Sequence, residues 1–151
     1  MTDRNSLIEK FGRALNTGDF DLMAEVLVED YVEEYPQSGE VIRGRANVLA
    51  MIENYPGRSS EQTLGQSESL TVKSFDAFKA VAPTFAVVRV EGAGDNGVAT
   101  LRATYPDGSK WWIVNIFTLR GNRIAHSRTF FAPDFPAPDW RAKWAEQTEG
   151  L

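Results

Sequence analysis

Two hydrophobic patterns follow one another along this chain, and their order restricts the folds that it can form. Up to about residue 54 the apolar residues recur at helical spacing, as Leu7, Phe11 and Leu15 do. From residue 84 to residue 131 the sequence is rich in Val, Ile, Phe, Trp and Thr, which favour β-strands. Helices followed by a run of strands predict an α+β fold with the helices on one face of a curved antiparallel sheet.

Capping residues set the predicted bounds of the helices. The Ser6–Glu9 segment has a capping-box pattern at the start of the first helix, and Gly18 can end that helix in a left-handed conformation. Asp19 can then cap a second helix. A short strand is expected at 31–35, and a third helix from about residue 45 to residue 54.

Four strands are predicted in the second half, at residues 84–91, 98–105, 110–120 and 123–131. A further strand at 71–75 follows a polar loop at 57–69. Because the connections among the four strands are short, neighbours should pair as antiparallel hairpins. A strongly bent sheet that is closed at one end by helices leaves a conical apolar cavity, which is a ligand site by default.

The length of 151 residues predicts a single domain that spans residues 1–151. Residues 132–151 form a tail that is rich in Pro and Trp and offers a short helix. Trp140 and Trp144 lie four residues apart on that helix, so we expect them to share a face and to pack the tail onto the body.

Composition excludes several classes of function. The chain has no cysteine and one histidine, so disulfides and thiolate metal sites are impossible. Its net charge is −5, so the chain lacks the basic surface that binding to nucleic acids requires. No apolar stretch approaches the length of a membrane span or a signal peptide, so neither a membrane partner nor export is expected and the cytoplasm is the default compartment. No phosphate loop or dinucleotide fingerprint is present, so no cofactor is expected.

Four segments carry a resemblance to a known family: KFGRALNTGDFDLMAEVL, EEYPQSGEVIRGR, WIVNIFTLRGNRI and SRTFF. They resemble the nuclear transport factor 2-like superfamily, in particular its SnoaL-like branch and the small ketosteroid isomerases, over residues 7 to about 131. The resemblance implies a cone-shaped α+β barrel of the cystatin-like kind, with a pocket between helices and sheet. It also implies a homodimer through the outer face of the sheet.

The catalytic residues of these relatives are largely replaced in this chain. Ketosteroid isomerases use a tyrosine, a carboxylate base and a protonated aspartate, and the matching positions resemble Phe11, Tyr35 and Asn115. Of these three residues only the asparagine can keep the role of its counterpart, by donating a hydrogen bond, since phenylalanine has no proton to donate and a neutral phenol is a poor base. Limonene-type epoxide hydrolases carry an aspartate where this chain has Thr129. Neither mechanism is therefore expected in its usual form.

Alternation along the strands predicts which side chains share the inner face. Glu33 is the one carboxylate with an inward direction, and burial in an apolar cavity would raise its pKa and make it a usable acid or base. The other interpretation places Glu33 in a solvated acidic stretch. The predicted catalytic residues are Glu33, Tyr35 and Asn115. The predicted ligand pocket comprises Phe11, Tyr31, Trp111, Ile113, Phe117, Ser127, Thr129 and Phe131.

The opposite parity places several side chains on the outer face. Ser127 and Thr129 should point inward, and side chains alternate along a strand, so His126 should face outward. Trp112, Ile116 and Phe130 should face outward as well. Large apolar side chains on an outer face indicate an interface, and they favour a homodimer.

Three functions remain compatible with these patterns. The chain could be a small acid–base enzyme, such as an isomerase, cyclase or dehydratase, that acts on a polyketide-, terpenoid- or steroid-like molecule. It could be a non-catalytic protein that binds a hydrophobic ligand in the same cavity. It could also be a structural dimerisation module whose own aromatic side chains fill the cavity. The residues alone leave open whether the chain is an enzyme.

Overall fold

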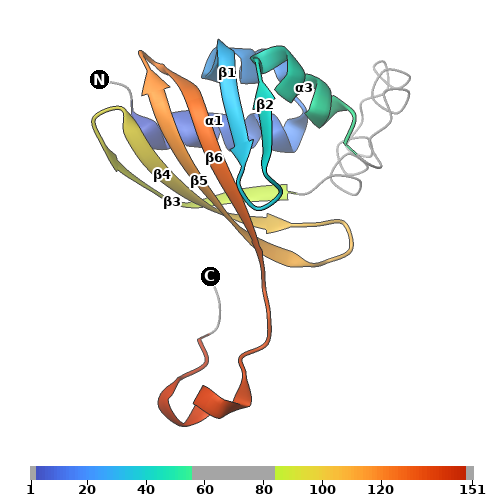
Figure 1. The fold of residues 1–151 in the computed structure, drawn as a ribbon, viewed down its shortest axis with the longest axis vertical. Helices are drawn as coiled ribbons and strands as arrows, with labels where there is room; N and C mark the ends of the chain where they lie inside the picture. Colours follow the sequence, from blue (N-terminus) through green and yellow to red (C-terminus); the bar gives the residue numbers. More distant parts are fainter. Residues whose placement is uncertain (1–2, 56–83, 149–151) are drawn as a thin grey trace.

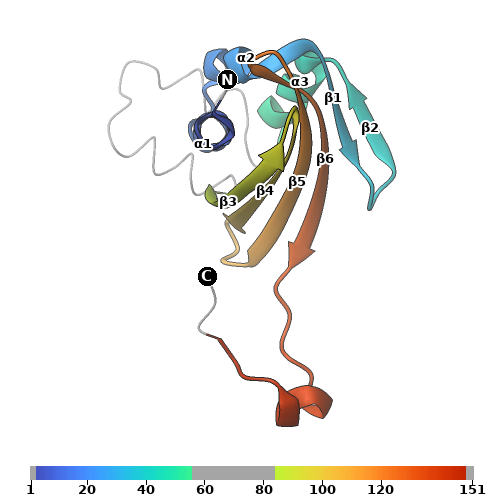
Figure 2. The same cartoon turned by 90° about the vertical axis from the view of Figure 1, so that its left-hand side faces the viewer.

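Helices cover one side of a curved six-stranded sheet (Figure 1). The computed structural model describes residues 3–55 and 84–148. The loop predicted at 57–69 and the strand predicted at 71–75 lie outside the described residues. In the second view α1 is seen end-on, within the hollow of the sheet, while α2 and α3 lie at one end of it (Figure 2). The predicted α+β architecture is confirmed, although the sheet stays open and does not close into a barrel.

The first helix, α1 (Arg4–Thr17), begins earlier than its sequence pattern predicts. Asp3 is the N-cap, and its carboxylate accepts a hydrogen bond from the Asn5 amide at 3.0 Å. The capping-box prediction at Ser6 is therefore wrong, because an aspartate three residues earlier satisfies the first free amides of the helix. Gly18 ends the helix with φ of 68°, as predicted, since glycine adopts this left-handed conformation without steric cost.

The second helix, α2 (Phe20–Val26), is capped by Asp19 as the sequence predicts. The Asp19 carboxylate accepts a hydrogen bond from the Leu22 amide at 2.8 Å. The chain becomes extended at the next residue, so β1 (Leu27–Tyr35) follows directly and is longer than the predicted strand. Because no loop separates α2 from β1, the chain passes directly from the helices into the sheet.

One strand was missed by the sequence patterns. After a turn over residues 36–39, the chain reverses into β2 (Glu40–Arg43), which pairs antiparallel with β1. The strand is only four residues long and mostly exposed, so it has no hydrophobic alternation to reveal it. It leads into α3 (Arg45–Glu53), which was predicted, and whose Val48 is buried against the sheet.

The remaining four strands match their predicted bounds to within two residues. They are β3 (Thr84–Ala93), β4 (Asn96–Thr104), β5 (Lys110–Arg120) and β6 (Arg123–Pro133). The sheet order is β2-β1-β6-β5-β4-β3, with the predicted antiparallel hairpins along β3 to β6. β1 joins this set by pairing parallel with β6, which places a strand from the first quarter of the chain beside the last strand in the middle of the sheet.

Gly97 gives a test of the packing between β4 and β5. It pairs with Phe117, and a Cβ added at Gly97 would lie 2.2 Å from the buried phenyl ring. We expect Gly97→Ala to lower the free energy of unfolding by about 1–3 kcal/mol, because the ring must shift within a packed core. Chemical denaturation measures the change.

Gly12 on α1 provides the matched control. A Cβ there would meet Val87 at an ordinary contact distance of 3.5 Å. Gly12→Ala should therefore raise the free energy of unfolding by about 0.5–1 kcal/mol, the usual gain from replacing glycine inside a helix. Equal effects of the two substitutions would contradict the described position of Phe117.

The tail differs from its predicted arrangement. A short 3₁₀ helix, η1 (Asp139–Trp144), lies well beyond the end of the sheet in both views (Figures 1 and 2). Trp140 and Trp144 are 74% and 76% exposed, so the prediction that they pack the tail onto the body is wrong. In a 3₁₀ helix side chains three residues apart share a face, so two tryptophans four apart do not form one joint surface. None of the described helices is long and apolar enough to cross a membrane.

Candidate functional site

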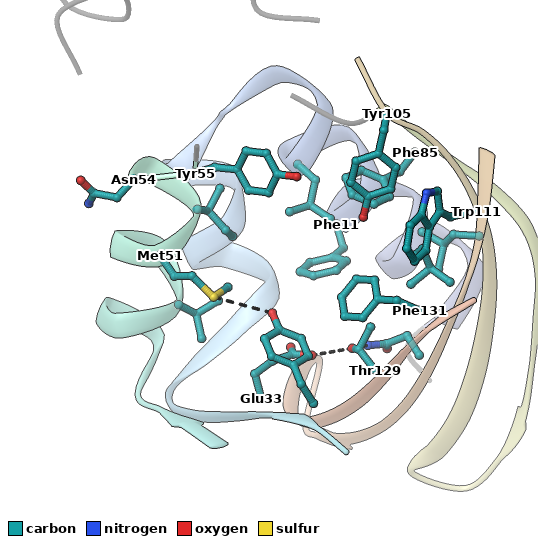
Figure 3. Close-up of a pocket in the computed structure, with 17 residues that line it drawn as sticks. Phe11, Glu33, Met51, Asn54, Tyr55, Phe85, Tyr105, Trp111, Thr129 and Phe131 are labelled. Atoms are coloured by element: carbon teal, nitrogen blue, oxygen red, sulfur yellow. Dashed lines mark hydrogen bonds between the residues drawn. The ribbon is translucent and has the colours of Figure 1, made fainter. Parts of the chain in front are cut away.

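A cavity of about 730 Å³ lies between the helices and the concave face of the sheet (Figure 3). α1 contributes Phe11 and Leu15, and α3 with its C-terminal end contributes residues from Val48 to Tyr55. Side chains from β1, β3, β4, β5 and β6 complete the wall. The wall is mainly aliphatic and aromatic, so the cavity suits an apolar molecule.

Three polar side chains lie next to one another at one end of this cavity. Glu33 on β1, Asn115 on β5 and Thr129 on β6 all border it, and each is less than 8% exposed. The Thr129 hydroxyl donates a hydrogen bond to Glu33 Oε1 at 2.5 Å. The Asn115 amide in turn donates to Thr129 Oγ1 at 2.8 Å. We call these three residues the polar trio.

Tyr31 lies in the core next to the polar trio and contacts Glu33. Its hydroxyl donates a hydrogen bond to Glu33 Oε2, so both carboxylate oxygens accept a hydrogen bond from the protein. Tyr31 is completely buried and does not border the cavity. Burial and the neighbouring Glu33 carboxylate raise the pKa of Tyr31 well above its ordinary value, so the phenol keeps its proton and remains a donor.

Burial controls the acidity of Glu33. Removal from water raises the pKa of the Glu33 carboxyl above its ordinary value of 4.5, while the hydrogen bonds from Thr129 and Tyr31 oppose that rise. The interpretation that placed Glu33 in a solvated acidic stretch is wrong, because its side chain faces the cavity and is 5% exposed. A raised pKa makes the protonated form of a carboxyl easier to reach, so the group can serve as an acid as well as a base.

Tyr35 also borders the cavity, and it follows Glu33 by two residues on β1. Its hydroxyl lies 3.8 Å from Met51 Sδ on α3, and its ring centroid lies 5.4 Å from that of Phe131. Burial, followed by the charge of Glu33, raises the pKa of Tyr35 above its ordinary value of 10. The phenol therefore stays protonated, which allows it to donate a hydrogen bond but not to act as a base.

The residues predicted for the ligand pocket divide into two groups. Those that border the cavity are Phe11, Trp111, Ile113, Thr129 and Phe131. Those that do not are Tyr31, Phe117 and Ser127, and their placement in the pocket wall is corrected here. Each of the second group is at most 1% exposed and lies two residues away from a member of the polar trio on the same strand. Strand parity identified the correct face, but the cavity ends at the polar trio and the next side chains form the core beneath it.

Several wall residues were missing from the predicted pocket. They are Leu15, Val48, Met51, Ile52, Asn54, Tyr55, Phe85, Leu101 and Tyr105. The helical periodicity of α3 already indicated that Val48 and Ile52 face inward, so part of this wall had a usable signal. The strand partners of Phe85 and Tyr105 could not be assigned without the register between β3 and β4.

The ionisable groups of the outer face are separate from the cavity. His126 Nε2 lies 3.4 Å from Glu34 Oε1, and Arg128 Nε lies 2.7 Å from Glu34 Oε2. None of the three borders the cavity. Across residues 3–55 and 84–148, no group of three His, Cys, Asp or Glu side chains could hold a metal ion.

Comparisons with known proteins agree with this geometry. The family model for the SnoaL-like domain matches residues 8–127. The chain belongs to the SnoaL-like domain family. This result confirms the resemblance that the sequence segments carry. No protein of curated function matches the chain significantly.

Solved structures show how widely the fold of this SnoaL-like protein is shared. An NTF-2 like protein of unknown function from Burkholderia xenovorans LB400 is 26% identical, with a TM-score of 0.71 over 95% of this chain and 94% of that one. A candidate ketosteroid isomerase from Kribbella flavida is 21% identical, with a TM-score of 0.71 over 96% and 89%. An LEH-like epoxide hydrolase from M. tuberculosis is 18% identical, with a TM-score of 0.58 over 83% and 80%. The last two establish the fold alone.

The raised pKa of Glu33 predicts a pH dependence of stability. Between pH 4.5 and the folded-state pKa, the folded protein keeps a proton on Glu33 that the unfolded chain has released. The contribution of Glu33 to the free energy of unfolding should therefore be largest below this interval and fall as the pH rises through it. Urea denaturation at a series of pH values measures the effect, and Glu33→Gln should remove this fall.

Glu34 is the matched control for that measurement. The hydrogen bond from Arg128 lowers the pKa of the Glu34 carboxyl below 4.5. Its contribution to stability is therefore present above pH 4.5 and lost as the pH falls through the lowered pKa, which is the opposite sign. A Glu34→Gln variant that lost the fall assigned to Glu33 would contradict the assignment.

Proposed function

We propose that this SnoaL-like protein is a small acid–base enzyme that binds an apolar molecule carrying an oxygen function, of polyketide, terpenoid or steroid type. The observation that carries the proposal is the buried Glu33 carboxyl at the end of an apolar cavity of about 730 Å³. Among the described residues that border the cavity, Glu33 is the only carboxyl, so it acts on the part of the ligand that reaches this end. Isomerisation, cyclisation and dehydration all require a proton transfer of this kind.

Glu33 is the group that moves the proton. In its ionised form it takes a proton from a carbon or hydroxyl group of the ligand, and in its protonated form it returns the proton to a second position. Burial raises the pKa of Glu33, which makes the protonated form easier to reach than in an exposed carboxyl. Tyr31 and Thr129 hold the two oxygens by donating hydrogen bonds, which keeps the carboxylate in one orientation while the ligand reacts.

Asn115 is the group that holds the ligand oxygen. One of its amide hydrogens is donated to Thr129. An asparagine side chain has a second amide hydrogen and a carbonyl oxygen, and the residue borders the cavity. A ligand carbonyl or hydroxyl next to Glu33 would therefore find a hydrogen-bond donor at the place where charge develops during proton transfer.

A second candidate function is binding without chemistry. The observation that favours it is that the protein itself donates a hydrogen bond to each oxygen of Glu33, through Tyr31 and Thr129. These bonds satisfy the carboxylate without any ligand. A protein that only binds its ligand needs no further partner for the Glu33 carboxylate. The third function, a dimerisation module filled by its own side chains, is disfavoured by the volume of the cavity.

Solvent deuterium distinguishes these functions. Steroids, terpenoids and polyketide fragments are first screened for a rise in melting temperature, because a ligand that binds the folded state stabilises it. Each ligand that binds is then incubated with the protein in D₂O and examined by NMR and mass spectrometry. Deuterium in the ligand, or a new product, supports the enzyme. Binding without either supports the second function, and a screen without any binder contradicts both.

A further inference from the structure

The cavity has a second polar end, which the proposed proton transfer does not use. Tyr55, which follows α3, and Tyr105, which follows β4, both border the cavity. Figure 3 shows them on the side of the cavity opposite to Glu33 and Thr129, with both hydroxyl groups directed into the hollow. We call Tyr55 and Tyr105 the far end. Because a few polar groups in fixed positions orient the ligand in an apolar pocket, the far end can take part in recognition.

The structure holds Tyr105 firmly but leaves its hydroxyl available. Its amide donates a hydrogen bond to the Ser109 carbonyl, and its carbonyl accepts one from the Gly108 amide, both at 2.9 Å. Its ring centroid lies 5.4 Å from that of Trp111, whose indole donates to Ser109 Oγ at 3.1 Å. Within residues 3–55 and 84–148, the Tyr105 hydroxyl makes no hydrogen bond. A donor that the fold has already positioned loses little conformational freedom when a ligand oxygen binds to it.

The phenol of Tyr105 suits an uncharged oxygen. Burial, followed by the neighbouring Tyr55, raises the pKa of Tyr105 above its ordinary value of 10, so the hydroxyl keeps its proton. It can therefore donate a hydrogen bond to a carbonyl, ether or hydroxyl oxygen. Among the described residues that border the cavity there is no Lys, Arg or His to balance an anionic group. Because an unpaired charge is costly to remove from water, we expect the ligand oxygen at this end to be neutral.

Strand geometry gives the separation between the far end and the polar trio. Trp111, against which Tyr105 packs, and Asn115 of the polar trio both border the cavity and lie four residues apart on β5. With a rise of about 3.3 Å per residue, they are about 13 Å apart along the strand. A hydrogen bond spans about 2.8 Å, so two ligand oxygens held at both ends would be roughly 8–13 Å apart. A single ring is too short for this separation, whereas several fused rings span it.

We propose that the substrate is an elongated molecule with an uncharged oxygen function at each end, and that Tyr105 binds the second oxygen. The proposal rests on the proposed function, since it takes the first oxygen to lie at Asn115 beside Glu33. Tyr55 borders the same far end from the helical side. Tyr105 is then a specificity-determining residue, because its hydrogen bond holds the reacting end of the ligand against Glu33. Contacts remote from the reacting atoms contribute to orientation in this way.

Two rigid probes test whether Tyr105 recognises a second oxygen. The molecule 2,7-dihydroxyfluorene carries a hydroxyl group at each end of a fused-ring body, and 2-hydroxyfluorene lacks one of them. Tyr105→Phe keeps the ring and removes only the hydroxyl. In titration calorimetry we expect this variant to bind the dihydroxy probe about 5- to 30-fold more weakly, because one ligand oxygen loses its partner. Affinity for 2-hydroxyfluorene should stay within a factor of about two, since its hydroxyl group lies at Asn115.

A double variant shows whether one molecule contacts both ends. In Tyr105→Phe, Asn115→Leu the two losses of affinity for the dihydroxy probe should multiply, since each substitution removes a different, distant contact of the same bound ligand. The matched control is Thr118→Val, which removes a hydroxyl group from β5 at a position that does not border the cavity. It should leave the affinity for both probes unchanged.

The outcomes separate this inference from the proposed function. Equal losses for the two probes, no loss with Tyr105→Phe, losses that do not multiply, or a dihydroxy probe that fails to bind the native protein would each overturn the inference. The deuterium test of the proposed function depends on Glu33 at the other end, so it can still succeed in these cases. A loss confined to the dihydroxy probe, without deuterium transfer to any bound ligand, would support the far end and contradict the acid–base chemistry.

Discussion

Glu33→Gln is expected to reduce turnover, or deuterium exchange into a bound ligand, by about 10²- to 10⁴-fold, the usual contribution of a positioned acid or base. Glutamine keeps the size of the side chain but cannot gain or lose a proton at neutral pH. Affinity for the ligand should change little, because the rest of the cavity wall, which is mainly apolar, remains intact. Single-turnover rates and titration calorimetry separate the two quantities.

The control for this variant is Glu34→Gln on the next residue of β1. Glu34 lies on the outer face with Arg128 and His126 and does not border the cavity. Its replacement should leave the rate within a factor of about two. If Glu33→Gln retained the native rate while Glu34→Gln slowed it, Glu33 would have no part in the chemistry.

Asn115→Leu is expected to weaken the binding of an oxygenated ligand by about 10- to 100-fold. Leucine has nearly the same shape but offers no donor, so the ligand oxygen would lose its hydrogen bond in a buried site, at a cost of about 1–3 kcal/mol. Thr129 itself donates the hydrogen bond to Glu33, so this bond remains when Asn115 is replaced. Calorimetric titration with a ligand from the screen measures the change.

A matched ligand provides the control for Asn115. The analogue in which hydrogen replaces the ligand oxygen should bind the native protein and Asn115→Leu with similar affinity. The difference between the two ligands should therefore shrink in the variant. An equal loss of affinity for both ligands would mean that Asn115 shapes the wall and does not recognise the oxygen.

The strands were predictable because their residues carry strong local signals. β3 to β6 are rich in β-branched and aromatic residues and are joined by short turns, and these features determine both their bounds and their antiparallel pairing. β2 lacked such a signal because its four residues are mostly exposed. The start of α1 was misplaced because the Ser6–Glu9 segment has the pattern of a capping box, whereas Asp3 caps the helix.

For the site, the sequence predicted only the face of the sheet toward which the side chains point. Period-two alternation placed Glu33, Asn115 and Thr129 on one face. It could not show that Thr129 donates a hydrogen bond to Glu33, because that contact needs the register between β1 and β6. The depth at which the cavity ends is set by packing of the whole core, so Phe117 and Ser127 could not be separated from Thr129 by sequence.

The parallel pairing of β1 with β6 has a consequence for biosynthesis. The Thr129 and Glu33 side chains that meet across this pair are 96 residues apart in the chain. Contacts between such distant residues form late, since loop closure must come before they contribute any stability. β6 must therefore leave the ribosome before the edge of β1 that faces it can be paired. Until then, the emerging amino-terminal segment has an unpaired strand edge, which is the period when chaperones would be most needed.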